Sequence, residues 1–152
     1  MKEVIMLATQ NDVPTMRITV PLIIKNLKPD RIVVISNVSN KQQIESLDGV
    51  CFFDEDNVIK GLSLGRVKEI LQELGGPVNR AGWYLQQFLK LGWAYHSVYD
   101  DYICVDSDTM ILDNISYIMN GKYLFTEKIE HHEPYFRTIN KLFDNKITTT
   151  NN

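Results

Sequence analysis

Two aspartates separated by one residue are the side chains whose spacing most directly indicates chemistry in this sequence. Asp106 and Asp108 come directly after residues 102–105, an apolar run with two β-branched members. Such a run is typical of a strand buried on both faces of a parallel sheet. Ligands of open α/β sheets bind at the carboxyl ends of such strands, so we expect both carboxylates to lie at a ligand site.

The spacing of the two carboxylates allows three interpretations. Neighbouring carboxylates repel each other, and a divalent cation removes this conflict. Because Mg²⁺ usually combines one or two carboxylates with substrate phosphates, the first interpretation is a Mg²⁺ or Mn²⁺ site that holds a diphosphate. In the second, one aspartate caps the next helix and the other is solvated. The third is the nucleophile motif of haloacid-dehalogenase-like phosphatases, Asp-x-Asp-x-Thr, although Met110 stands where that motif requires threonine.

The elements that must position these aspartates alternate between strand and helix. Runs rich in apolar and β-branched residues predict strands at 4–8, 32–35, 50–53 and 102–105. Helical spacing and helix-boundary residues predict helices at 14–27, 42–47, 67–74 and 80–92. We also expect a short helix at 113–119 and a further strand at 123–125. This order predicts an α/β domain with a mainly parallel sheet of about five or six strands.

The helix predicted at 80–92 carries two rows of side chains. Its apolar row has the spacing of a core-facing stripe and consists of Ala81, Tyr84, Leu85, Phe88 and Leu89. A second row consists of Arg80, Trp83 and Gln87. Because arginine binds phosphate through a planar fork, this row could hold a diphosphate and a base. Alternatively, it is an ordinary exposed face whose tryptophan packs on a neighbouring loop.

Two other polar clusters allow a binding role or a structural one. The acidic triplet 54–56 follows a predicted strand, where it could bind a metal or a ribose hydroxyl, or form a solvated loop or helix cap. Histidines and glutamates at 130–133 could bind zinc, but their spacing differs from the His-Glu-x-x-His motif. Exposed loop histidines are the alternative there.

Composition excludes several functional classes. The chain has 152 residues, of which 44% are hydrophobic and 23% charged, and its net charge of −3 argues against a nucleic-acid binder. Its apolar runs are too short for a membrane span, and its start lacks the pattern of a signal peptide. Cys51 and Cys104 lie in predicted strands, so we expect reduced core thiols and a cytoplasmic protein.

Four stretches taken together resemble a known family. In chain order they are residues 52–56, 80–91, 102–112 and 132–136. The combination resembles GT-A-type glycosyltransferases of the DUF6492 group. The resemblance implies a Rossmann-like nucleotide-sugar-binding domain at 1–143, with helices flanking a mainly parallel sheet. The remaining residues, 144–152, form a polar tail that we expect to be disordered.

The resemblance also implies roles for individual residues. Asp106 and Asp108 match the family's Asp-x-Asp motif, which holds Mn²⁺ or Mg²⁺ against the donor diphosphate, and the metal stabilises the leaving group as a Lewis acid. The expected donor-binding residues are Thr9, Asn37, Arg80, Trp83, Gln87 and Ser107. The expected acceptor-side residues are His132, Glu133 and Tyr135. No residue is assigned as the catalytic base.

The chain length departs from the family pattern. GT-A enzymes normally continue into a second half that carries the acceptor site, so we expect this chain to be a truncated, donor-binding part. Transfer of the sugar to an acceptor of unknown chemistry is the family's activity. The alternatives are a nucleotide-sugar-binding module without turnover and a part that pairs with a second chain supplying the missing half.

Overall fold

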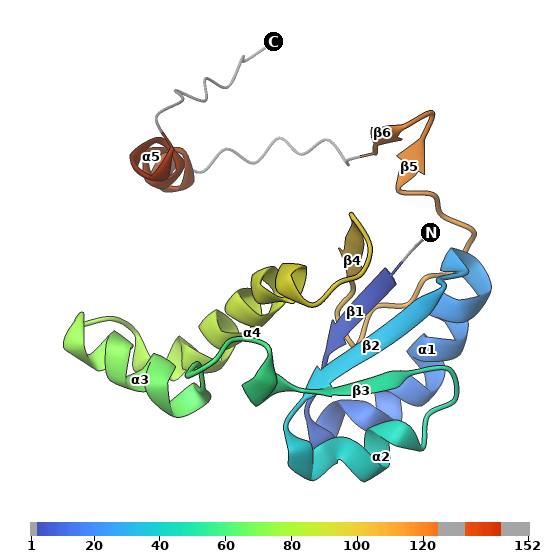
Figure 1. Cartoon of the computed structure of the whole chain (residues 1–152), viewed down its shortest axis with the longest axis horizontal. Helices are drawn as coiled ribbons and strands as arrows, with labels where there is room; N and C mark the ends of the chain where they lie inside the picture. Colours follow the sequence, from blue (N-terminus) through green and yellow to red (C-terminus); the bar gives the residue numbers. More distant parts are fainter. Residues whose placement is uncertain (1–2, 125–132, 144–152) are drawn as a thin grey trace. The chain divides into compact units, whose positions relative to one another are not determined.

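The computed structural model describes residues 3–124 and 133–143. The chain divides into two compact units, Met1–Ser116 and Tyr117–Asn152. The first unit contains a four-stranded sheet and four α-helices (Figure 1). Among the described residues, no helix is both long enough and apolar enough to cross a membrane.

All four strands of the sheet run parallel. In chain order they are β1 (Glu3–Leu7), β2 (Arg31–Ser36), β3 (Cys51–Asp54) and β4 (Tyr102–Cys104). Their order across the sheet is β3-β2-β1-β4. The chain therefore moves outward from β1 to β3 and then returns to the other side of β1. The direction of strand addition reverses between β1 and β4, which is the topological switch point of the sheet.

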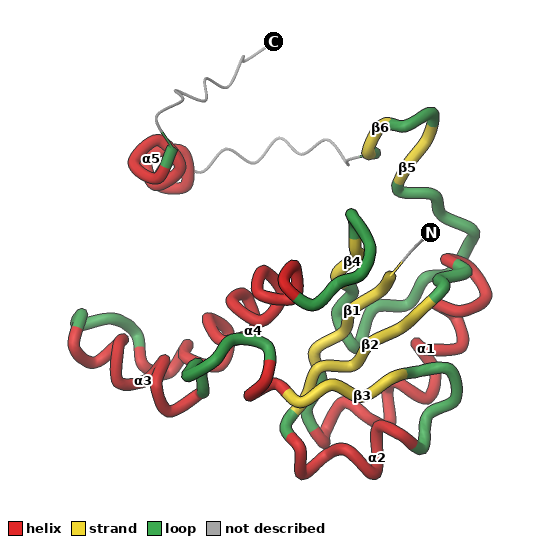
Figure 2. Tube along the Cα trace, viewed as in Figure 1, coloured by secondary structure: helices red, strands yellow, loops and turns green. Residues whose placement is uncertain are grey.

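The helices of the first unit lie on both faces of this sheet. The α-helices are α1 (Val13–Leu27), α2 (Lys41–Glu45), α3 (Leu64–Glu73) and α4 (Ala81–Gly92). Short 3-10 helices occupy Gln10–Asp12, Val38–Asn40, Glu55–Asn57, Val78–Arg80 and Trp93–Tyr95. Figures 1 and 2 show α1 and α2 on one face, with α3 and α4 on the other.

The core follows from the two-residue period of the strands. Ile5, Val33 and Ile35 point to one face, where they form a cluster with buried side chains of α3 and α4. The alternate residues of β1 and β2 are also buried: Val4, Met6, Ile32 and Val34. Burial of both faces explains why these strands are continuous apolar runs rather than alternating ones.

The structure confirms the α/β architecture, with a parallel sheet flanked by helices as in Rossmann-like domains. The sheet has four strands in the described residues, fewer than expected. The prediction that residues 102–105 form a strand buried on both faces is wrong, because β4 spans three residues at the sheet edge and Cys104 is exposed. The prediction of buried thiols is also wrong for Cys51, which begins the opposite edge strand β3 and is exposed.

The described residues of the second unit, 117–124 and 133–143, form a small hairpin and one helix. Strands β5 (Ile118–Met119) and β6 (Lys122–Tyr123) pair antiparallel, and α5 spans Glu133–Leu142. The two residues between the strands, Asn120 and Gly121, have φ angles of 53° and 73°. Positive φ at both positions is the geometry of the tight hairpin turns that an Asn-Gly pair favours. The helix predicted at 113–119 is therefore wrong, and Phe125 of the further predicted strand lies outside the described residues.

Candidate functional site

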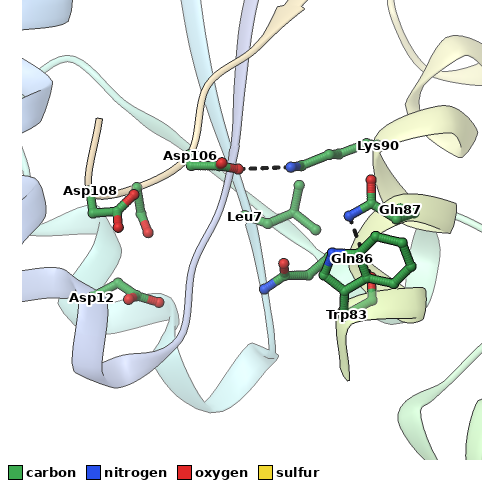
Figure 3. A pocket seen from close by; sticks show the side chains of 9 residues that line it. Leu7, Asp12, Trp83, Gln86, Gln87, Lys90, Asp106 and Asp108 are labelled. Carbon is green, nitrogen blue, oxygen red and sulfur yellow. Dashed lines mark hydrogen bonds and ion pairs between the residues drawn. The ribbon is translucent and has the colours of Figure 1, made fainter. Parts of the chain in front are cut away.

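A polar pocket lies at the switch point, at the carboxyl ends of β1 and β4 (Figure 3). Its volume is about 470 Å³, within the range of small-molecule sites. It is lined by Leu7, Asp12, Trp83, Gln86, Gln87, Lys90, Asp106, Ser107 and Asp108. The side chains of the three aspartates lie on one side, and those from α4 lie on the other. Open α/β sheets bind ligands at this location, because the crossovers diverge there and leave a crevice.

The backbone around the Asp-x-Asp segment continues the sheet for one residue and then turns. The N–H of Val105 donates to the carbonyl of Ile5 at 3.0 Å, so the segment leaves the sheet directly beside β1. The N–H of Thr109 donates to the carbonyl of Asp106 at 3.0 Å and closes a tight turn. This turn exposes the carboxylates of Asp106 and Asp108 while it buries Ser107 between them.

Two buried side chains of α1 donate hydrogen bonds to backbone carbonyls of this segment. The hydroxyl of Thr19 donates to the carbonyl of Ser107 at 2.9 Å. The amide of Asn26, two turns further along the helix, donates to the carbonyl of Ile111. Both donors are buried, so neither bond is exchanged readily for water. Helix α1 therefore fixes the position of the segment that carries both aspartates.

The pocket contains three carboxylates and one ammonium among its described lining residues. Lys90 Nζ lies 2.7 Å from Asp106 Oδ1, and this ion pair joins α4 to the segment after β4 (Figure 3). The Asp106 side chain is 68% exposed, whereas that of Lys90 is 20% exposed. Asp108 and Asp12 face the same cavity. The pocket therefore keeps an excess of negative charge, which favours a cationic ligand.

The second row of α4 faces the pocket in part. Trp83 and Gln87 line it, and the Trp83 side chain remains 47% exposed. The guanidinium of Arg80 lies 4.6 Å from the centroid of the Trp83 ring, so Arg80 stacks on that ring rather than lining the cavity itself. The predicted apolar row is wrong at Phe88, which is 44% exposed because it lies outside the stripe that meets the sheet.

Thr9 contacts the pocket through Asp12. The backbone N–H and the hydroxyl of Thr9 both donate to Asp12 Oδ2, at 2.6 and 2.9 Å. These bonds orient the Asp12 carboxylate at the end of β1.

Asn37 lies at the end of β2, outside the set of residues that line the pocket. Its Nδ2 donates to Glu55 Oε1 at 3.2 Å, and its Oδ1 accepts from the N–H of Ser39 at 3.1 Å. Burial raises the pKa of Glu55; the hydrogen bond from Asn37 lowers that pKa, and the charges of Asp56 and Asp54 raise it further. Asp54 also caps the next 3-10 helix by accepting from the N–H of Asp56, so part of the acidic triplet has the capping role that the sequence allowed.

The expected acceptor-side residues belong to the second unit. Glu133 begins α5 and Tyr135 lies in its first turn. His132 lies outside the described residues. The polar tail at 144–152 also lies outside them.

The oxygen-rich lining of the pocket fits a hard divalent cation. Aspartate carboxylates and a serine hydroxyl are the ligand types that Mg²⁺ and Mn²⁺ prefer. In the described parts of the chain, no group of three or more His, Cys, Asp or Glu residues is arranged to hold a metal. Asp106 and Asp108 could supply two carboxylate ligands to such a cation, which would need further oxygen ligands from outside the protein.

Several pocket residues were not anticipated from the sequence. Lys90 and Gln86 come from α4, and Asp12 comes from the turn after β1. Lys90 had a signal, because it continues the row of Trp83 and Gln87 by one further helical step. For Asp12, only its place in a polar turn could have indicated a role in the pocket.

Comparison of the chain with protein-family models, with curated proteins and with solved structures finds no significant match. The fold and the pocket by themselves define an α/β protein with an acidic, partly aromatic cavity at the switch point of a parallel sheet.

Proposed function

We propose that this chain binds a nucleotide-sugar together with Mn²⁺ or Mg²⁺ in the switch-point pocket. The observation that carries the proposal is the placement of Asp106 and Asp108 at the carboxyl end of β4, across one cavity from Trp83 and Gln87. A diphosphate needs cationic neutralisation, and a nucleoside base needs a flat apolar surface. One side of the pocket supplies metal ligands, and the other supplies an exposed ring and amide groups.

Different residues are proposed to contact different parts of the ligand. Asp106 and Asp108 hold the cation, which neutralises the diphosphate and stabilises it as a leaving group. The half-exposed ring of Trp83 offers a stacking surface, and the stacked guanidinium of Arg80 places a positive charge beside it. Ser107 approaches the ribose from between the two aspartates. Thr9, at the end of β1, acts through the Asp12 carboxylate that it orients, and the role of Asn37 near the base stays a prediction because Asn37 does not line the pocket.

We further propose that the chain is the donor-binding part of a GT-A-type glycosyltransferase. The parallel sheet, the Asp-x-Asp motif after β4 and the tryptophan-bearing helix support this proposal. Transfer of the sugar to an acceptor stays a prediction, as do the acceptor-side roles of Glu133 and Tyr135. Binding without transfer is the alternative, and sugar release measured with and without added acceptors separates the two.

Calorimetry tests the donor site directly. UDP-sugars and GDP-sugars are titrated into the full chain with Mn²⁺ and again with a chelator. We expect metal-dependent binding that the double variant Asp106→Asn, Asp108→Asn weakens by more than about tenfold, because both cation ligands lose their charge.

The chain offers a matched control for this experiment. Asp54 and Asp56 have the same spacing at the carboxyl end of β3, the strand at the opposite edge of the parallel sheet. The double variant Asp54→Asn, Asp56→Asn removes the same charge and should leave donor binding unchanged. Equal losses in both double variants, or no nucleotide binding by the native chain, would refute the proposed site. Phosphate release from a simple phosphomonoester would instead indicate the phosphatase interpretation.

A further inference from the structure

Lys90 is the basic side chain among the described residues that line the pocket, and it already occupies one of the proposed metal ligands. Its Nζ lies 2.7 Å from Asp106 Oδ1. A contact of this length is a charge-assisted hydrogen bond rather than a loose surface pair. A divalent cation that binds Asp106 must therefore either bind Oδ2 close to the ammonium or displace the ammonium from Oδ1.

The backbone of Lys90 is anchored, while its ammonium can move. The hydroxyl of Tyr102 in β4 donates to the Lys90 carbonyl at 2.6 Å. The preceding residue, Leu89, is buried in the core. These contacts hold helix α4 against β4, the strand that precedes Asp106. The position of the Lys90 backbone relative to Asp106 is therefore fixed. The flexible four-carbon stem still allows the charge to reach other partners within the cavity.

The charges in the pocket indicate how Lys90 responds when a divalent cation and a diphosphate bind. An ammonium and a divalent cation on the same carboxylate repel each other, because one negative charge faces three positive ones. A diphosphate brings new anionic oxygens into the same cavity. Charge complementarity then favours the cation on Asp106 and Asp108, and the ammonium on a phosphate oxygen.

We propose that Lys90 is a phosphate-binding residue that exchanges Asp106 for the diphosphate when donor and divalent cation bind. This inference rests on the proposed function and adds a mechanism that couples the two ligands. Without nucleotide, Lys90 competes with the cation for Asp106 and keeps metal affinity low. With nucleotide, the displaced ammonium gains a new partner, so each ligand raises the affinity of the other.

The test compares Lys90→Met with Lys90→Arg and with Lys68→Met as a control. Methionine keeps the length of the stem and removes the charge, arginine keeps the charge, and Lys68 is an exposed lysine of α3 outside the pocket. Mn²⁺ binding to the full chain is followed by electron paramagnetic resonance with and without UDP. UDP binding at saturating Mn²⁺ is followed by calorimetry.

Two changes in opposite directions are expected for Lys90→Met. Mn²⁺ should bind at least about threefold more tightly without nucleotide, and UDP about tenfold more weakly at saturating Mn²⁺, as expected when one charge-assisted hydrogen bond is lost. Lys90→Arg should retain UDP binding, and Lys68→Met should match the native chain in both measurements.

The outcomes separate this inference from the proposed function. If Lys90→Met leaves both affinities unchanged, or weakens both, the exchange is refuted, while Mn²⁺ binding that depends on Asp106 still supports the donor site. If the native chain binds neither Mn²⁺ nor UDP, both proposals fail together. Circular dichroism of each variant shows whether it is folded, and Lys90→Gln, which also removes the charge, supplies the same comparison if Lys90→Met is not.

Discussion

The hydrogen bond between Thr19 and the Asp-x-Asp segment allows a sharp test of how the pocket is built. The Thr19 hydroxyl donates to the Ser107 carbonyl at 2.9 Å and joins positions 88 residues apart in the chain. Thr19 is fully buried, and Ser107 is 9% exposed. Thr19→Val keeps the branched shape of the side chain and replaces the hydroxyl with a methyl group. The substitution therefore removes the donor and leaves a buried carbonyl without this partner.

The expected loss of stability follows from burial. An unsatisfied buried acceptor costs about 1–3 kcal/mol. Threonine and valine are both β-branched and have similar helix propensities, so the helix itself contributes little to the difference. We therefore expect the free energy of unfolding to fall by about 1–3 kcal/mol. For a chain of 152 residues, each kcal/mol corresponds to a decrease of about 2–4 °C in Tm.

Thr15→Val provides the matched control. Thr15 lies one turn earlier on α1 and is partly exposed, and its hydroxyl makes no hydrogen bond to the described part of the chain. Urea and thermal unfolding of both variants should show the loss in Thr19→Val alone. The proposed donor site adds a second readout, since a displaced Ser107 backbone should also weaken metal-dependent nucleotide binding. Equal stability of the two variants would show that α1 does not hold the segment through this bond.

Two further predictions concern polar groups that are partly or fully shielded from water. The pKa of Glu55 is raised from its ordinary value of 4.5, mainly by burial, so the folded state binds the proton more tightly than the unfolded state. The stability contributed by the protonated Glu55 should therefore be lost as pH rises from about 4.5 through the raised pKa. At pH 7 Glu55→Gln should be more stable than the native chain by less than about 1 kcal/mol, and at pH 4 it should not be more stable. Urea unfolding at both pH values checks the sign, and a less stable variant at pH 7 would contradict it. Trp93→Phe removes the indole N–H that donates to buried Glu3 Oε2 at 2.8 Å. Urea unfolding should therefore show a decrease of about 2–3 kcal/mol in the free energy of unfolding. Trp83→Phe, at an exposed position, is the control and should change it by less than about 0.5 kcal/mol.

The local elements of this protein could be predicted from the sequence because their signals are local. The β-branched runs at 32–35 and 4–8 formed buried strands, and apolar residues at helical spacing marked α1, α3 and α4. Asp106 and Asp108 could be assigned to the end of a strand for the same reason. The helix predicted at 113–119 failed because Asn120 and Gly121 favour a hairpin, and this turn preference decided the local fold.

Burial and neighbour relations could not be predicted in the same way. The apolar run before Asp106 indicated a strand but not its place in the sheet, and the structure places β4 at an edge where Cys104 is exposed. A strand's own residues specify its periodicity, whereas its neighbours depend on how all the helices pack on both faces. Similarly, the spacing of Trp83 and Gln87 on α4 indicated that both could contact a ligand. The exposure of Phe88 depended instead on which side of the helix packs against the sheet.

The sequence by itself determined which segments form strands and helices, and which side chains could ligate a cation. The tertiary structure alone decided that β1 and β4 are neighbours, which brings Asp12 to the same cavity as Asp106 and Asp108. It also decided that Thr19 holds Ser107 and that Lys90 pairs with Asp106. These contacts join residues far apart in the chain, and they form because the sheet and helices bury their apolar faces together. No local pattern records which partners that packing will bring within hydrogen-bond distance.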